Sequence, residues 1–185
     1  MKATGIVRRI DDLGRVVIPK EIRRTMRIRE GDPLEIYTDR EGEVIFKKYS
    51  PIGELTGFAA QYAETLHKTC SMAVIITDRD AVIACAGVSK KEYADKHLSD
   101  ELEALIERRS LYLWSEGEEK LPVTVDGGSH FVSCAMPIIS EGDIVGCVAS
   151  VVEIGVEKPH AALGNEVEGK LIMTAASFLG KQLES

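Results

Sequence analysis

The sequence lacks the short motifs that mark the common nucleotide-dependent and hydrolytic enzymes. It contains no GxGxxG, no P-loop, no GxSxG and no HExxH pattern. The four histidines are scattered, and only His67 has a cysteine, Cys70, one helical turn away. Nothing at matching spacing completes a metal-ligand set, so a surface histidine beside a buried cysteine is the favoured interpretation. We therefore predict that the chain is not an enzyme and has no metal site and no cofactor.

Long apolar runs are also missing. No run approaches the roughly 18 residues that a membrane-spanning helix needs. The N-terminal stretch MKATGIVRRIDD has no apolar segment like that of a secretory signal. We therefore expect a cytoplasmic protein that makes no contact with a membrane.

Closely spaced cysteine pairs are absent as well. Cys70, Cys85, Cys134 and Cys147 are separated by 15, 49 and 13 positions, with no CxxC pair, so we expect reduced thiols. The last three lie in apolar, strand-like segments, and no Lys or Arg lies beside them in sequence to lower a thiol pKa. A structural role for these cysteines is favoured, and a cysteine-based redox enzyme remains the alternative.

Positive charge is scarce in the chain as a whole but concentrated at one end. The 185 residues carry a net charge of −7, yet residues 1–29 contain nine basic and three acidic side chains, a net charge of +6. The other 156 residues therefore carry −13. A basic arm on an acidic body is typical of contact with nucleic acid or another anionic surface, although a solvated, salt-bridged surface explains the charge equally well.

The first part of the chain predicts short extended elements. Residues 4–10 and 15–18 are each expected to form a strand, with a turn at Gly14 between them. The segment LEIYTDREGEVIFKK, residues 34–48, predicts a β-hairpin whose turn contains Gly42.

A short helix is expected between these strands and the hairpin. Pro19 suits its first position because the missing N–H would have no partner there. Ile22 and Met26 would then form the inner face, with the basic residues elsewhere around the helix.

A module of about 50 residues buries too little surface to be comfortably stable alone. No cysteine precedes Cys70, so dimerisation is the simplest stabilising device.

The character of the sequence changes at Ser50-Pro51, which suggests domains at 1–50 and 51–185. The second begins with an amphipathic helix, continues through strand-like runs at MAVIITD, AVIACAG, LYLW, LPVTVDGGSHFVSCAMPII and DIVGCVASVVEI, and closes with a helix from about Ala161. Ser89 and Glu92 fit a capping box. The last strand is apolar on both faces, so both should be covered. We expect an α+β domain, an antiparallel sheet flanked by helices.

Arginine is the residue type that phosphate recognition favours, because its planar guanidinium offers a fixed fork of donors and does not titrate. The segment GRVVIPKEIRR, followed by GD and a hairpin, closely resembles the N-terminal domain of AbrB-type transition-state regulators. The resemblance implies that two chains interleave their hairpins into one swapped-hairpin β-barrel that binds double-stranded DNA. The positions that match the family's DNA-binding arginines are Arg8, Arg15, Arg23 and Arg24. The plausible flanking contacts are Lys2, Arg9 and Lys20.

One position departs from the AbrB-type pattern. Relatives often have glycine where this chain has Arg27. We therefore expect the end of the short helix to be built differently, and the basic segment gains one charge.

Residues 51–185 resemble a GAF domain, a small-molecule sensing fold, in the order of their elements. An AbrB-like domain followed by a GAF-like domain resembles a family of regulators that activate and repress late, forespore-stage genes in spore-forming bacteria. The resemblance implies a cytoplasmic, nucleoid-associated protein. It also implies a homodimer through the barrel, a homotetramer through the GAF-like domain, and a small-molecule ligand of unidentified chemistry.

Two other functions compete with transcriptional regulation. The GAF fold also hosts a cysteine-dependent reductase, which would need an exposed thiol of low pKa. The swapped-hairpin barrel is also shared with antitoxins, which usually carry a flexible toxin-binding tail, whereas residues 51–185 are expected to be folded.

Overall fold

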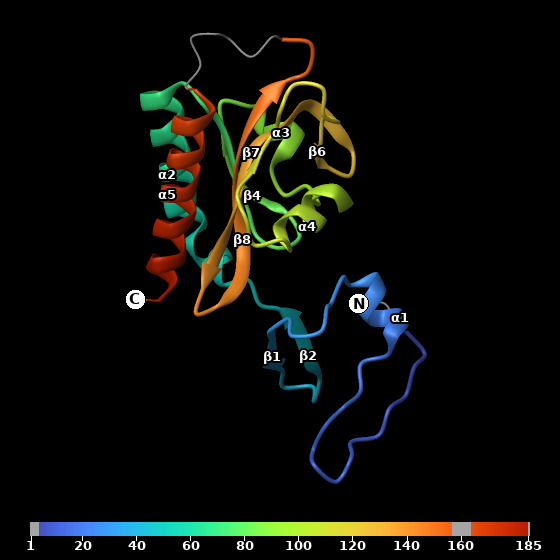
Figure 1. Cartoon of the computed structure of the whole chain (residues 1–185). Helices are drawn as coiled ribbons and strands as arrows, with labels where there is room; N and C mark the ends of the chain where they lie inside the picture. Colours follow the sequence, from blue (N-terminus) through green and yellow to red (C-terminus); the bar gives the residue numbers. More distant parts are fainter. Residues whose placement is uncertain (1–3, 157–163, 185) are drawn as a thin grey trace. The chain divides into compact units, whose positions relative to one another are not determined.

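The computed structural model describes residues 4–156 and 164–184 and divides the chain into two compact units, residues 1–49 and 50–185 (Figure 1). The position of one unit relative to the other is not determined, so each is described by itself. Among the described residues, no helix combines the length and the hydropathy that crossing a membrane requires.

The N-terminal unit contains the predicted hairpin. Strand β1 (Leu34–Thr38) pairs antiparallel with β2 (Val44–Lys48), with Ile36 opposite Phe46 in the register. Alternation of side chains along a strand places Ile36, Val44 and Phe46 on one face of this two-stranded sheet. All three are exposed, at 61%, 58% and 42%. The hairpin prediction is confirmed, and the chain by itself leaves its apolar face open.

The two other predicted strands of this unit are wrong for the single chain. Residues 4–10 and 15–18 belong to no strand and form the arms of a loop (Figure 1). The loop is closed at its tip by the Asp11 N–H donating to the Arg15 carbonyl at 3.0 Å. Gly14 has φ +77° there, so the predicted turn is confirmed. A β-strand needs a neighbouring strand for its N–H and C=O groups, and the arms have none within the described part of the chain.

Helix α1 (Lys20–Thr25) begins one residue later than predicted, with Pro19 as its N-cap residue. Ile22 is half-buried, in agreement with an inner face, whereas Met26 is 58% exposed. The prediction that Met26 packs on the buried inner face of the helix is therefore wrong within a single chain.

The C-terminal unit is built on a six-stranded antiparallel sheet. The strands are β3 (Ala73–Thr77), β4 (Val82–Ala86), β5 (Tyr112–Leu113), β6 (Pro122–Thr124), β7 (Gly127–Ser140) and β8 (Asp143–Glu153). Their order is β4-β3-β8-β7-β5, with β6 pairing β7. The long hairpin of β7 and β8 lies at its centre. All pairings are antiparallel, as predicted.

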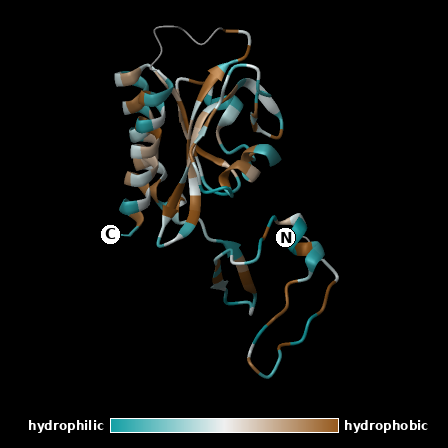
Figure 2. Cartoon of the chain, in the orientation of Figure 1, coloured by the Kyte–Doolittle hydropathy of each residue, from teal (hydrophilic) through white to brown (hydrophobic). Residues whose placement is uncertain are grey.

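Helices cover both faces of this sheet (Figure 1). On one face, the 3-10 helix η1 (Pro51–Leu55), α2 (Thr56–Cys70) and α5 (Asn165–Leu183) enclose a core that includes Ala63, Ile138 and Leu179. On the other face, α3 (Lys90–Tyr93) and α4 (Asp100–Ile106) enclose a second core that includes Tyr93 and Leu102. Apolar residues gather along the strands between them (Figure 2). The predicted α+β architecture and the two-sided burial of β8 are confirmed.

The capping box predicted at Ser89 and Glu92 is not formed. Ser89 is the N-cap residue of α3 but accepts no cap hydrogen bond through its side chain, so the proposed capping box is wrong. The Glu92 carboxylate instead accepts hydrogen bonds from the backbone N–H and the hydroxyl of Ser129. The predicted start of the last helix, near Ala161, lies outside the described residues.

Candidate nucleic-acid interface

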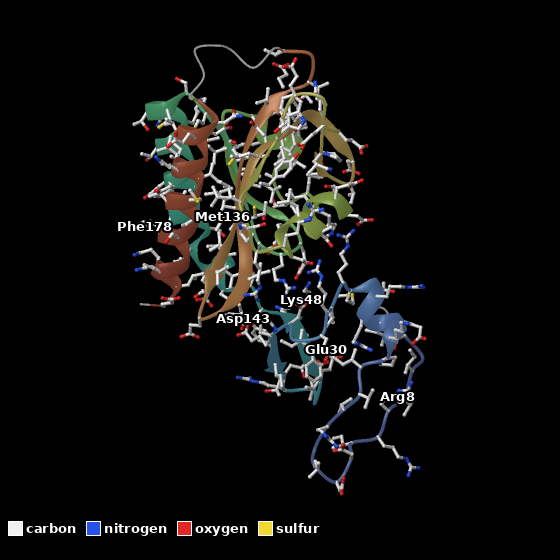
Figure 3. The ribbon with its side chains drawn as sticks, in the orientation of Figure 1. Arg8, Glu30, Lys48, Met136, Asp143 and Phe178 are labelled. Carbon is white, nitrogen blue, oxygen red and sulfur yellow. The ribbon has the colours of Figure 1, made fainter. Side chains whose placement is uncertain are left out.

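The loop of the N-terminal unit carries three of the predicted DNA-binding residues. Arg8 and Arg9 lie on its first arm and Arg15 follows its tip, and all three are exposed. Figure 3 labels Arg8 on this arm. Lys2 lies outside the described residues. Among the residues that the structure describes, no strand pairs with Arg8 or Arg9. The alternation that would turn these two side chains to opposite faces therefore depends on a strand partner.

Helix α1 carries the other three. Lys20 and Arg24 are exposed and Arg23 is half-buried. Both arginines lie in the last turn of the helix, where positive charge is favourable because the helix C-terminus is partially negative. Their role in binding DNA remains a prediction.

Arg27 ends this helix in the left-handed region, with φ +51°. The N–H of Ile28 donates to the Arg23 carbonyl at 2.7 Å, and the N–H of Arg27 donates to the Arg24 carbonyl at 3.2 Å. These two bonds are those of a Schellman motif, which normally has glycine at the left-handed position. The departure noted in the sequence therefore falls at the residue whose backbone conformation favours glycine.

The backbone conformation of Arg27 leads to a stability prediction. We expect Arg27→Gly to be about 1 kcal/mol more stable than Arg27→Ala, because a Cβ atom in the left-handed region is penalised. Both variants lose the same side chain and charge, so their difference isolates the backbone term. Urea unfolding followed by far-UV circular dichroism measures it. Equal stability of the two variants would contradict a left-handed residue at this position.

The hairpin contacts the segment that follows α1 through Lys48. Its ammonium donates to the Arg27 carbonyl at 2.7 Å and lies 3.5 Å from the carboxylate of Asp32, whose side chain is only 4% exposed. Asp32 also accepts from the Arg29 N–H at 2.8 Å. These bonds attach the C-terminal end of α1 to β2 and so fix the helix that carries Arg23 and Arg24. This role of Lys48 could not be predicted from the sequence, because its partners lie 16 and 21 positions away.

An acidic residue, Asp11, binds the predicted DNA-contacting residue Arg15. One carboxylate oxygen, Oδ1, accepts from the N–H groups of Leu13 at 3.0 Å and Arg15 at 2.8 Å, and Oδ2 accepts from Arg15 Nε at 2.8 Å. The backbone and side-chain hydrogen bonds from Arg15 lower the pKa of Asp11. This pair was not predicted from the sequence, although an aspartate four residues before an arginine across a glycine turn is a pattern that could have indicated it.

Three of the four cysteine thiols are shielded from solvent, and Cys70 is half-buried. Cys85, Cys134 and Cys147 are buried. Burial raises the pKa of Cys147, and it also raises that of Cys85, where the positive charge of Lys90 partly opposes it. Lys90 lies five positions after Cys85, so its influence on this thiol was not visible among the adjacent residues of the sequence. Neutral thiols are poor nucleophiles and poor metal ligands. Within residues 4–156 and 164–184, no group of three or more His, Cys, Asp or Glu side chains could hold a metal ion.

Comparison with known proteins identifies the family. The family model described as "Stage V sporulation protein T C-terminal, transcription factor" matches residues 54–184. The chain is 51% identical to Stage V sporulation protein T of Bacillus subtilis (strain 168), over 100% of this chain and 99% of that protein. The chain belongs to the stage V sporulation protein T family. This confirms the resemblance to a two-domain sporulation regulator, and it places the chain among transcription factors.

The N-terminal unit of this stage V sporulation protein T family member has further relatives. It is 65% identical over 51 residues to the transition state regulatory protein AbrB of Bacillus subtilis (strain 168), a match that covers 28% of this chain and 52% of AbrB. The family model "Antidote-toxin recognition MazE, bacterial antitoxin" matches residues 7–53. The predicted AbrB-like domain is therefore confirmed, and the match to the antitoxin model covers much the same part of the chain.

A solved structure is similar to the C-terminal unit. It is that of the cofactor binding GAF domain of the nutrient sensor CodY from Clostridium difficile, which is 14% identical, with a TM-score of 0.41. The match covers 67% of this chain and 83% of the CodY domain.

Proposed function

We propose that the chain is a homo-oligomeric regulator, cytoplasmic and nucleoid-associated, that binds double-stranded promoter DNA. In this proposal it activates some late, forespore-stage sporulation genes and represses others. The observation that carries the proposal is a set of arginines, exposed except for the half-buried Arg23, on a unit 65% identical to AbrB. Arg8, Arg15, Arg23 and Arg24 would contact phosphates and base edges, with Lys2, Arg9 and Lys20 beside them.

The DNA-binding form is proposed to be a dimer with interleaved hairpins. The apolar face of the hairpin and the apolar side chains of the loop arms are exposed in the single chain; those on the arms include Val7, Ile10 and Val17. So many exposed apolar side chains in a unit of about 50 residues indicate an interface with another chain. A second copy would supply both the missing burial and the strand partners that residues 4–10 and 15–18 lack. The basic residues would then appear twice, on a two-fold interface.

The salt dependence of DNA binding tests the proposal. If eight arginines per dimer contact phosphates, log K should fall against log salt concentration with a slope of roughly −7. Fluorescence anisotropy of a labelled promoter duplex, titrated with the full chain at several salt concentrations, measures this slope. Arg24→Gln should reduce its magnitude by about 2, because the dimer loses two contacts. Arg108→Gln, an equal charge change on an exposed arginine of the C-terminal unit, should leave it unchanged, and a nearly flat wild-type dependence would contradict the proposal.

A second contact between copies is proposed on the helices of the C-terminal unit. Phe178 on α5 lies 5.6 Å from the ring of Tyr62 and 5.8 Å from that of Phe58, both on α2. Phe178 is 40% exposed, and Val167 and Met173 of α5 are also exposed. This aromatic face would join two barrel dimers into a tetramer. The sedimentation of a variant in which the hairpin contact between copies is broken tests this proposal.

The two competing functions receive less support. A thiol-dependent reductase needs an activated cysteine, whereas burial raises the pKa of Cys85 and Cys147. An antitoxin needs a segment that folds on its toxin, whereas the residues after the barrel domain form a sheet with helices on both faces. A small-molecule ligand of the C-terminal unit remains part of the proposal, with its chemistry unidentified.

A further inference from the structure

We propose that Asp11 is a positioning residue that orients the guanidinium of Arg15 for contact with DNA. The inference rests on the proposed function, because it assigns a role within the same interface. It starts from an apparent conflict: a carboxylate lies inside the basic arm, where its charge should weaken the attraction of a polyanion.

The geometry gives this carboxylate a specific task. Asp11 engages Arg15 only through Nε, at 2.8 Å. A guanidinium carries five N–H donors in one plane, so the bond through Nε does not use the two terminal nitrogens. These nitrogens have no partner in the described part of the chain. The Arg15 side chain is 69% exposed. The terminal pair is the edge that makes bidentate bonds with a phosphate or with guanine.

The same carboxylate also holds the backbone from which Arg15 projects. Its Oδ1 binds the N–H groups of Leu13 and Arg15, and the backbone of Asp11 exchanges further hydrogen bonds with Gly14 and Arg15. Asp11 therefore fixes both the backbone at Arg15 and the Nε atom of its otherwise flexible side chain. Fixing a long side chain before binding reduces the conformational entropy lost when it meets its partner.

The neighbouring Asp12 offers a matched comparison. It carries the same charge one position away and makes no hydrogen bond or ion pair with the described residues. If only charge mattered, neutralising either aspartate would strengthen DNA binding. If Asp11 positions Arg15, the two substitutions have effects of opposite sign.

The experiment measures binding of a labelled promoter duplex to full-length variants. We expect Asp12→Asn to strengthen binding about threefold through its charge, and Asp11→Asn to weaken it about tenfold. Asparagine keeps an Oδ1 acceptor for the two backbone N–H groups, so the loop should keep its conformation, which far-UV circular dichroism checks. The magnitude of the salt slope of Asp11→Asn should fall towards that of Arg15→Ala, a change that a purely structural role would not produce.

A double-mutant cycle completes the test. In an Arg15→Ala background, Asp11→Asn should no longer weaken binding. The proposal is overturned if Asp11→Asn strengthens binding as Asp12→Asn does, or if it weakens binding equally with and without Arg15. Either result leaves a steep wild-type salt dependence intact, so the proposed function would survive. A flat wild-type dependence would overturn both.

Discussion

Replacing Ile36 with aspartate is expected to weaken DNA binding by more than about 100-fold. Ile36 lies opposite Phe46 on the apolar face of the hairpin, the face that the proposed barrel dimer would bury. A carboxylate there would be buried without a partner in two copies per dimer, at a cost of several kcal/mol. Each 1.4 kcal/mol is a factor of ten in the association constant. Loss of the dimer separates the two sets of arginines and so removes half of the contacts to one duplex.

The mass of the Ile36→Asp variant distinguishes the two proposed contacts. Sedimentation velocity should find a wild-type tetramer and a variant dimer, because the aromatic face of α2 and α5 would still join two chains. A monomeric variant would contradict the proposed contact on α5, and an unchanged tetramer would contradict the buried hairpin face. Arg40→Gln, which changes the net charge by the same amount at the exposed hairpin turn, serves as the control. It should leave the mass unchanged.

Replacing Gly180 with alanine is expected to destabilise the C-terminal unit by about 3 kcal/mol. Alanine should favour an α-helix by about 1 kcal/mol over glycine, so propensity alone predicts the opposite sign. Gly180 is buried in α5, however, and a Cβ atom there would overlap the carbonyl oxygen of Ile139 on β7. That oxygen belongs to the backbone of a central strand, so the helix has to move away from the sheet.

Gly169 of the same helix provides the control. A Cβ atom at Gly169 would lie 3.3 Å from the terminal Cδ2 of Leu111, the flexible end of a side chain. Gly169→Ala should therefore be neutral or stabilising by up to about 1 kcal/mol. Urea unfolding of both variants, followed by the fluorescence of the single tryptophan, Trp114, measures the difference. Equal stabilities would show that α5 is not held close to β7.

Much of the C-terminal fold could be predicted because its patterns are local. The i, i+3, i+4 apolar spacing from Leu55 to Leu66 predicted α2, and the run from Ile144 to Val152 predicted a strand covered on both faces. The sequence could not show which helix covers which face, because both cores draw on the same apolar residue types. Nor could it show that Glu92 binds Ser129, 37 positions away, rather than capping its own helix.

The N-terminal unit shows where such prediction fails. The strands expected at 4–10 and 15–18 are not formed in one chain, since a strand depends on its neighbour as much as on its own residues. The burial expected of Met26 fails as well. Both expectations came from patterns that fit a dimer, and a pattern does not say which chain supplies the partner.

The sequence by itself determined the basic N-terminal arm, the hairpin, the α+β character of residues 51–185 and the residue types that could meet DNA. These follow from charge, periodicity and turn residues, which act over a few positions. Only the tertiary structure decided that Arg27 ends α1 in a left-handed conformation, that Asp11 binds the Nε of Arg15, and that Gly180 approaches the backbone of β7. Those facts depend on the backbone path and on distances between atoms, which a residue's neighbours in the sequence constrain only weakly.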